Sequence, residues 1–174
     1  WLNLPKILEL VINDGVSTIS GERLTTGQEY EDATDLLSTI RQRFYQKVDF
    51  YLDRMVESAN GASIAISHLK VPFLSAFMGG IQSGIDMRDT TRQGTKYNGS
   101  GCLIHGLSVI ADSFIAIDCL LKEQPQNAQL LITALQNNFV GYEQLQKYLK
   151  SCPKYGNNIE QVPNEANIIA NTIS

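Results

Sequence analysis

The strongest constraint in this sequence is a long run of apolar residues at helical spacing between residues 31 and 59. From Asp35 onward an apolar side chain recurs every three or four positions, and charged residues occupy the positions between them. Such a stripe is typical of a helix that buries one face. The run therefore predicts one long amphipathic helix, and its apolar members are Leu36, Leu37, Ile40, Phe44, Val48, Tyr51, Leu52, Met55 and Val56.

A few residues predict where this long helix begins and ends, and whether it packs in a core or in a coiled coil. Asp32 or Thr34 is the expected N-cap, because a short side-chain oxygen accepts a hydrogen bond from a free backbone N–H. Gly61 is expected to break or kink the helix. The stripe lacks a strict heptad, so a core helix is favoured over a coiled-coil arm.

The remaining sequence indicates a mainly α fold with a few strands, in the α/β class. Strand character is confined to about residues 94–105, and Gly106 marks the junction with a buried helix that continues to residue 123. Residues 15–31 and 88–101 are polar and rich in turn residues, so both are expected to be loops. The other predicted helices cover residues 3–13, 73–87, 127–139, 141–150 and 159–173.

Composition excludes several classes of protein. The chain has 174 residues, 43% of them apolar, which suits one globular domain. Its 14 Lys and Arg residues against 18 Asp and Glu residues lack the basic excess of a nucleic-acid binder. No uncharged apolar run of roughly 18 residues is present, so no membrane span is expected. Free thiols indicate a reducing, cytoplasmic setting.

Few residues offer catalytic or metal-binding chemistry. The cysteines are Cys102, Cys119 and Cys152, the histidines are His68 and His105, and no CxxC pair occurs. A zinc site is therefore not expected. Cys102 and His105 are the one local nucleophile–base pair, but on a strand they would point to opposite faces. A packed cysteine and histidine is the favoured interpretation, whereas a thiol hydrolase would show rapid alkylation of Cys102.

Three stretches of the sequence together resemble one enzyme family. The first is Asn3-Leu4-Pro5 through Asp14-Gly15, and the third is Cys152-Pro153-Lys154-Tyr155-Gly156-Asn157. The second runs from Gly94-Thr95-Lys96-Tyr97-Asn98 through Gly101 and Gly106 to Ala111-Asp112-Ser113-Phe114. Their order and spacing resemble those of the glycyl radical enzymes. The resemblance is to the branch related to pyruvate formate-lyase, which includes glycerol and diol dehydratases, choline lyase and arylacetate decarboxylases.

This resemblance implies a large parent enzyme. The family uses a backbone glycyl radical and a cysteine loop, and neither motif occurs in the 174 residues. Residues 1–174 are therefore expected to be an internal fragment of a pyruvate formate-lyase-like domain, with no catalytic residue and no metal of its own. The parent's radical would be installed by an activating enzyme that uses S-adenosylmethionine and an iron–sulfur cluster. The parent is also expected to be a homodimer in an anaerobic cytoplasm.

The family fold implied by the resemblance is a ten-stranded barrel wrapped by helices, with the substrate at its centre. The strand after Lys96-Tyr97-Asn98 would border the substrate, so the expected substrate-binding residues are Asn98, Ser100, Cys102, Ile104 and His105. His105 would bind an acidic substrate group or donate a proton if it faces inward, and would pack against outer helices otherwise.

Two functions remain open from the sequence. The chain is expected to supply barrel wall and outer helices to a radical lyase, dehydratase or decarboxylase that acts on a small organic molecule. The alternative is a non-catalytic helical scaffold, or a split subunit with the same architecture that completes a partner.

Overall fold

The computed structural model describes residues 1–26, 36–92 and 101–173 and divides the chain into two compact units. The smaller unit contains Trp1–Leu2 and Tyr51–Leu103, and the larger one contains Asn3–Phe50 and Ile104–Ser174. Helices predominate, as predicted from the sequence. The strands β1 (Leu2–Asn3) and β2 (Ile104–His105) form a two-stranded sheet.

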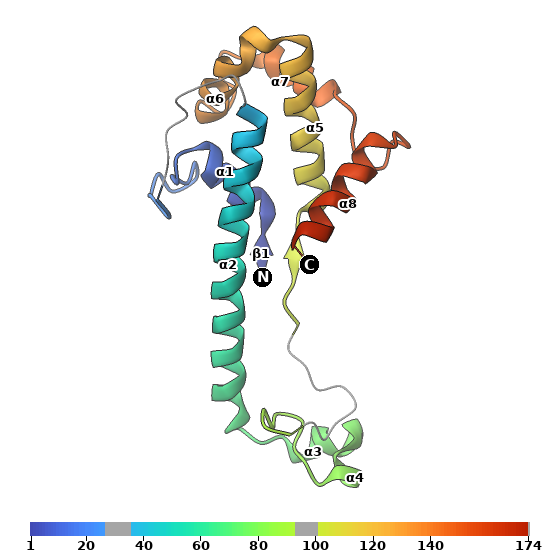
Figure 1. The fold of residues 1–174 in the computed structure, drawn as a ribbon. Helices are drawn as coiled ribbons and strands as arrows, with labels where there is room; N and C mark the ends of the chain where they lie inside the picture. Colours follow the sequence, from blue (N-terminus) through green and yellow to red (C-terminus); the bar gives the residue numbers. More distant parts are fainter. Residues whose placement is uncertain (27–35, 93–100, 174) are drawn as a thin grey trace. The chain divides into compact units, whose positions relative to one another are not determined.

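The larger unit is built around α5 (Leu107–Glu123). This helix packs against α1 (Leu4–Ile12), α7 (Glu143–Ser151) and α8 (Gln161–Ile173), and Figure 1 shows α8 running beside it. Because neighbours cover several of its sides, α5 is apolar over most of its surface. A short 3₁₀ turn, Pro125–Asn127, leads from α5 into α6 (Ala128–Gln136).

The helix predicted over residues 3–13 is confirmed as α1, and its ends have the chemistry typical of helix termini. The Asn3 side chain accepts the backbone N–H of Lys6 at 3.3 Å, and Pro5 lies in the first turn, where its missing N–H costs nothing. Asp14 and Gly15, with φ of 50° and 78°, turn the chain away after the helix. The predicted cap residues of the next helix, Asp32 and Thr34, lie outside the described residues.

An aromatic contact joins α2 (Leu36–Ser67) to α5 in the larger unit. The rings of Phe44 and Phe114 are both fully buried and meet edge to face, with centroids 5.5 Å apart. The Arg41 guanidinium lies 4.5 Å from the Phe114 ring centroid and forms a 2.6 Å ion pair with Glu165 of α8. One cluster therefore connects α2, α5 and α8.

The predicted break in the long helix is wrong, because α2 continues through Gly61 to Ser67. No atom lies within 4 Å of a Cβ built at Gly61, so nothing in the structure requires a bend there. The apolar stripe is buried as predicted from Leu36 to Val48, but further along it is more open, and Val56 is 48% exposed.

The smaller unit contains three short helical segments instead of the single helix predicted over residues 73–87. These segments are α3 (Pro72–Ser75), a π-turn (Ala76–Gly80) and α4 (Ile81–Ser83). Gly79 has φ of 100°, outside the helical region, and this conformation interrupts the helix.

Replacing Gly61 with alanine is expected to stabilise the protein. Gly61 has open space around it and lies inside α2, six residues before its last residue, and glycine in a helix interior is less stable than alanine by roughly 0.5–1 kcal/mol. The midpoint of urea unfolding should rise for Gly61→Ala and fall by a similar amount for Ala65→Gly on the same helix. A lower midpoint for Gly61→Ala would show that the helix needs glycine there.

Candidate functional site

The predicted substrate-binding residues are only partly visible in the structure. Asn98 and Ser100 lie outside the described residues. Cys102 and His105 are exposed, and Ile104 is half-buried in β2. No hydrogen bond joins the described side chains of Cys102 and His105, so the geometry does not support a nucleophile–base pair.

The strand β2, which carries Ile104 and His105, is followed by a glycine that is in close contact with a proline ring. Gly106 separates β2 from α5 with φ of 94°, and a Cβ on it would overlap the Pro5 ring. Only glycine fits such a position without displacement. The contact joins the first and second family-like stretches, which lie far apart in the sequence.

The second and third stretches are joined by a carboxylate. Asp112 Oδ1 of α5 accepts the backbone N–H of Tyr155 at 2.7 Å. Lys154 Nζ donates to the carbonyl oxygens of Leu149 and Cys152, at 3.0 and 2.9 Å. The Asp112–Tyr155 bond holds the turn after α7 against α5, and the Lys154 bonds fasten that turn to the end of α7. Within the second stretch, the segment 106–112 therefore contacts the first stretch at Gly106 and the third stretch at Asp112.

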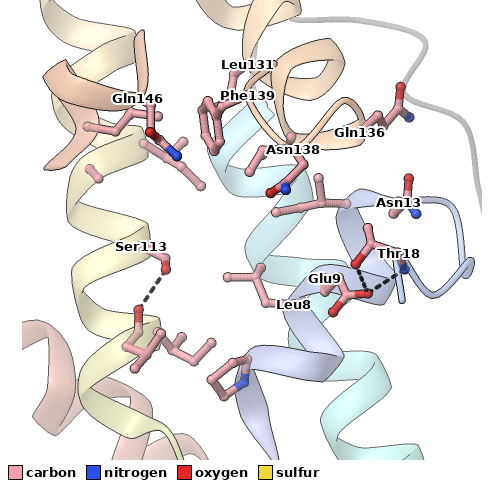
Figure 2. Close-up of a pocket in the computed structure, with 18 of the residues that line it drawn as sticks. Leu8, Glu9, Asn13, Thr18, Ser113, Leu131, Gln136, Asn138, Phe139 and Gln146 are labelled. Carbon is pink, nitrogen blue, oxygen red and sulfur yellow. Dashed lines mark hydrogen bonds between the residues drawn. The ribbon is translucent and has the colours of Figure 1, made fainter. Parts of the chain in front are cut away.

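A pocket of about 960 Å³ opens in the larger unit. It lies between α1 with the following loop on one side and α5, α6 and α7 on the other, as Figure 2 shows. Leu8, Leu131 and Phe139 contribute apolar surface, and Glu9 and Thr18 lie together across from Ser113. Nothing in the sequence predicts this pocket, because its lining residues come from four separate stretches of the chain, within 5–21, 109–117, 131–139 and 146–154.

Glu9, one of two acids that line this pocket with Asp112, accepts three hydrogen bonds from within the chain. Its Oε1 accepts Lys6 Nζ at 2.7 Å and both the backbone N–H and the hydroxyl of Thr18 at 2.8 Å. Burial raises the pKa of Glu9, but these hydrogen bonds outweigh burial and leave the pKa below its ordinary value. Glu9 is therefore an ionised anchor for the loop after α1 and not a free base.

The described part of the chain has neither a cluster of metal ligands nor a single helix suited to a membrane. No group of three His, Cys, Asp or Glu residues there is arranged to hold a metal ion. Over the same residues, no single helix has the length and apolarity to cross a membrane. The pair formed by α2 and Pro72–Ser83 satisfies both criteria, but its two members meet at a bend of 103°.

Removal of the Asp112 carboxylate is expected to destabilise the protein. Asp112→Ala leaves the Tyr155 N–H without its partner, at a cost of about 1–2 kcal/mol in the free energy of unfolding. Asp112→Asn keeps an accepting oxygen and should stay closer to the parent protein. Asp118→Ala is the matched control, since Asp118 forms a surface ion pair with the exposed Lys122. Equal urea midpoints for Asp112→Ala and Asp118→Ala would refute this role of Asp112.

Comparisons with known proteins extend over the whole chain. The family model described as "Pyruvate formate lyase-like" matches residues 1–174. The chain is 33% identical over 165 residues to (2S)-3-sulfopropanediol dehydratase of Klebsiella oxytoca, which covers 90% of this chain and 19% of that protein. Over 164 residues it is 28% identical to trans-4-hydroxy-L-proline dehydratase of Clostridioides difficile, which covers 90% of this chain and 20% of that protein.

Solved structures agree with these sequence matches. The glycerol dehydratase of Clostridium butyricum, in a glycerol-bound form, superposes with a TM-score of 0.81 at 27% identity and covers 98% of this chain. The hydroxyproline dehydratase of Clostridioides difficile, with its substrate bound, superposes with a TM-score of 0.82 at 25% identity and covers 97% of this chain. This chain spans 22% of each of those two structures, or about a fifth of the length of its relatives.

Proposed function

Since the chain belongs to the pyruvate formate lyase-like family, we propose that it forms part of a glycyl radical enzyme that breaks a C–O, C–C or C–N bond in a small organic substrate. The observation that carries this proposal is the family match over residues 1–174, together with relatives that are dehydratases by name. In this proposal, residues 1–174 are an internal part of a larger pyruvate formate lyase-like domain.

The relatives favour dehydration over the other reactions of the family. Their names and bound ligands specify a sulfopropanediol, a hydroxyproline and glycerol, which are all small molecules with a hydroxyl group on a saturated carbon. The proposed reaction is the loss of water from a substrate of this class, with a lyase or decarboxylase as the alternative within the same family.

This chain's proposed contribution is one wall of an enclosed substrate cavity. Ile104 would present apolar surface, and Asn98, Ser100, Cys102 and His105 would lie along the same wall, with His105 binding or protonating a polar substrate group. The buried face of α5 would exclude water from behind the strand. The glycyl radical of the parent enzyme would supply hydrogen-atom abstraction, and residues outside this chain would carry that chemistry.

The proposal extends to the parent's partners. An activating enzyme with S-adenosylmethionine and an iron–sulfur cluster would generate the radical. The parent would work as a homodimer. It would need an oxygen-free cytoplasm, because oxygen destroys backbone radicals.

The decisive experiment uses the native gene product, purified without oxygen. Its intact mass is measured first, and it is then incubated with an activating enzyme of the family, S-adenosylmethionine and a reductant. A mass several times 19.3 kDa, a glycyl radical signal in electron paramagnetic resonance and dehydration of glycerol, a sulfopropanediol or hydroxyproline are expected. A mass near 19.3 kDa with no radical would overturn the enzyme proposal in favour of a scaffold or split subunit. A radical without turnover would reject these three substrates.

His105 provides a sharper test of the proposed wall. In the activated enzyme, His105→Gln is expected to lower kcat/KM by about tenfold or more at each pH measured. His68→Gln is the matched control, because His68 is the chain's other histidine and lies just after α2. If the two variants have the same kcat/KM and the same pH profile, His105 does not contact the substrate.

A further inference from the structure

Two cysteines that the sequence separates by 33 positions come together between α5 and α7. Tyr148 of α7 donates its hydroxyl hydrogen to Glu123 of α5 at 2.7 Å, which fixes how the two helices face each other. Cys119 lies one turn before Glu123, and Cys152 lies one turn after Tyr148. The two helices therefore place Cys119 opposite Cys152, one helical turn away from the Tyr148–Glu123 hydrogen bond.

The surroundings of the two thiols differ. Cys152 is 8% exposed and its thiol donates to the Tyr148 carbonyl at 3.5 Å. Burial raises the pKa of Cys152, and the charge and hydrogen bond of the adjacent Cys119 thiol raise it further. Cys119 is half-buried and so more open to a reagent from solvent. Cys102, the remaining cysteine, is exposed and belongs to the other compact unit.

We propose that Cys119 and Cys152 form a redox modification site, a dithiol that hydrogen peroxide converts to a disulfide. Cys119, the more accessible thiol, would react first: its sulfur takes one oxygen from the peroxide, giving a sulfenic acid and one water. The Cys152 sulfur then attacks the Cys119 sulfur, the S–S bond forms, the S–O bond breaks, and the hydroxyl leaves with the Cys152 proton as a second water. The two sulfur atoms together lose two electrons, and the peroxide gains them.

The disulfide would have a defined structural effect. It would tie α5 to the turn at Cys152–Tyr155, which the Asp112 and Lys154 hydrogen bonds already hold. This inference does not depend on the proposed function, because it needs only the contact between α5 and α7.

The test treats the full-length native gene product with hydrogen peroxide, blocks free thiols with N-ethylmaleimide and digests the protein with trypsin. Residues 97–122 carry Cys102 and Cys119 in one tryptic peptide, and residues 151–154 carry Cys152 in another. A disulfide-linked pair of these peptides is expected only after peroxide, and fragmentation should place the bond on Cys119.

Three variants separate the outcomes. The linked pair should persist in Cys102→Ser and fall by about tenfold or more in Cys119→Ser and Cys119→Ala. Neither Cys119 substitution alters a fully buried side chain, and unchanged melting temperatures would exclude unfolding as the reason for the loss. The proposal is overturned if peroxide leaves Cys119 and Cys152 individually alkylated, or if the linked pair persists in Cys119→Ser and disappears in Cys102→Ser.

Discussion

Phe114→Ala is expected to lower the free energy of unfolding by about 3–5 kcal/mol, because it removes a fully buried ring from the centre of the larger unit. The substitution also removes the edge-to-face contact with Phe44, which keeps its ring contact with Tyr45, and the ring beside the Arg41 guanidinium. Urea unfolding of the purified protein, followed by circular dichroism, measures the change.

Phe114→Leu is the control for this substitution. Leucine keeps most of the apolar volume but loses both ring contacts, so it should cost about 1–2 kcal/mol. The ion pair between Arg41 and Glu165 remains in both variants. If Phe114→Ala unfolds at the same urea concentration as Phe114→Leu, the ring does not fill the space that the structure assigns to it.

Gly106→Ala is expected to cost about 2–4 kcal/mol, from the positive φ of residue 106 and from the overlap of the new methyl group with the Pro5 ring. Because Gly106 joins β2 to α5, relief of this overlap would displace the strand that carries Ile104 and His105. In the proposed parent enzyme, activity should therefore fall as well as stability.

Two further variants separate the conformational cost of Gly106→Ala from its steric cost. Gly84 also has a positive φ, 66°, but has open space around it, so Gly84→Ala should show only the conformational cost of about 1 kcal/mol. Adding Pro5→Ala to Gly106→Ala should recover part of the stability, because the proline ring is what the methyl group meets. Full additivity of the two substitutions would mean that Pro5 and Gly106 do not touch.

Much of the local structure could be predicted because it depends on neighbours in the sequence. The cap at Asn3, the end of α1 at Asp14–Gly15 and the buried stripe from Leu36 to Val48 all follow from residues within a few positions of each other. Gly61 was misread because a glycine lowers helix stability by only about 1 kcal/mol, which a helix of 32 residues tolerates.

The candidate site was less predictable from the residues themselves. The resemblance of three stretches to one family pointed to the strand before Gly106, and the comparisons support that family over the whole chain. The predicted Asn98 and Ser100 lie outside the described residues, and the roles of Cys102, Ile104 and His105 stay predictions. The pocket between α1 and α5 had no signal in the sequence, since no single segment carries its lining.

The sequence by itself determined the helical character of this chain, most of its helix boundaries and its likeness to glycyl radical enzymes. Only the tertiary structure decided that Gly106 meets Pro5, that Asp112 holds Tyr155 and that Cys119 faces Cys152. The reason is physical: helical periodicity arises between residues three or four positions apart, whereas these contacts join residues tens of positions apart. Such contacts exist only once helices have packed, because packing selects which faces meet.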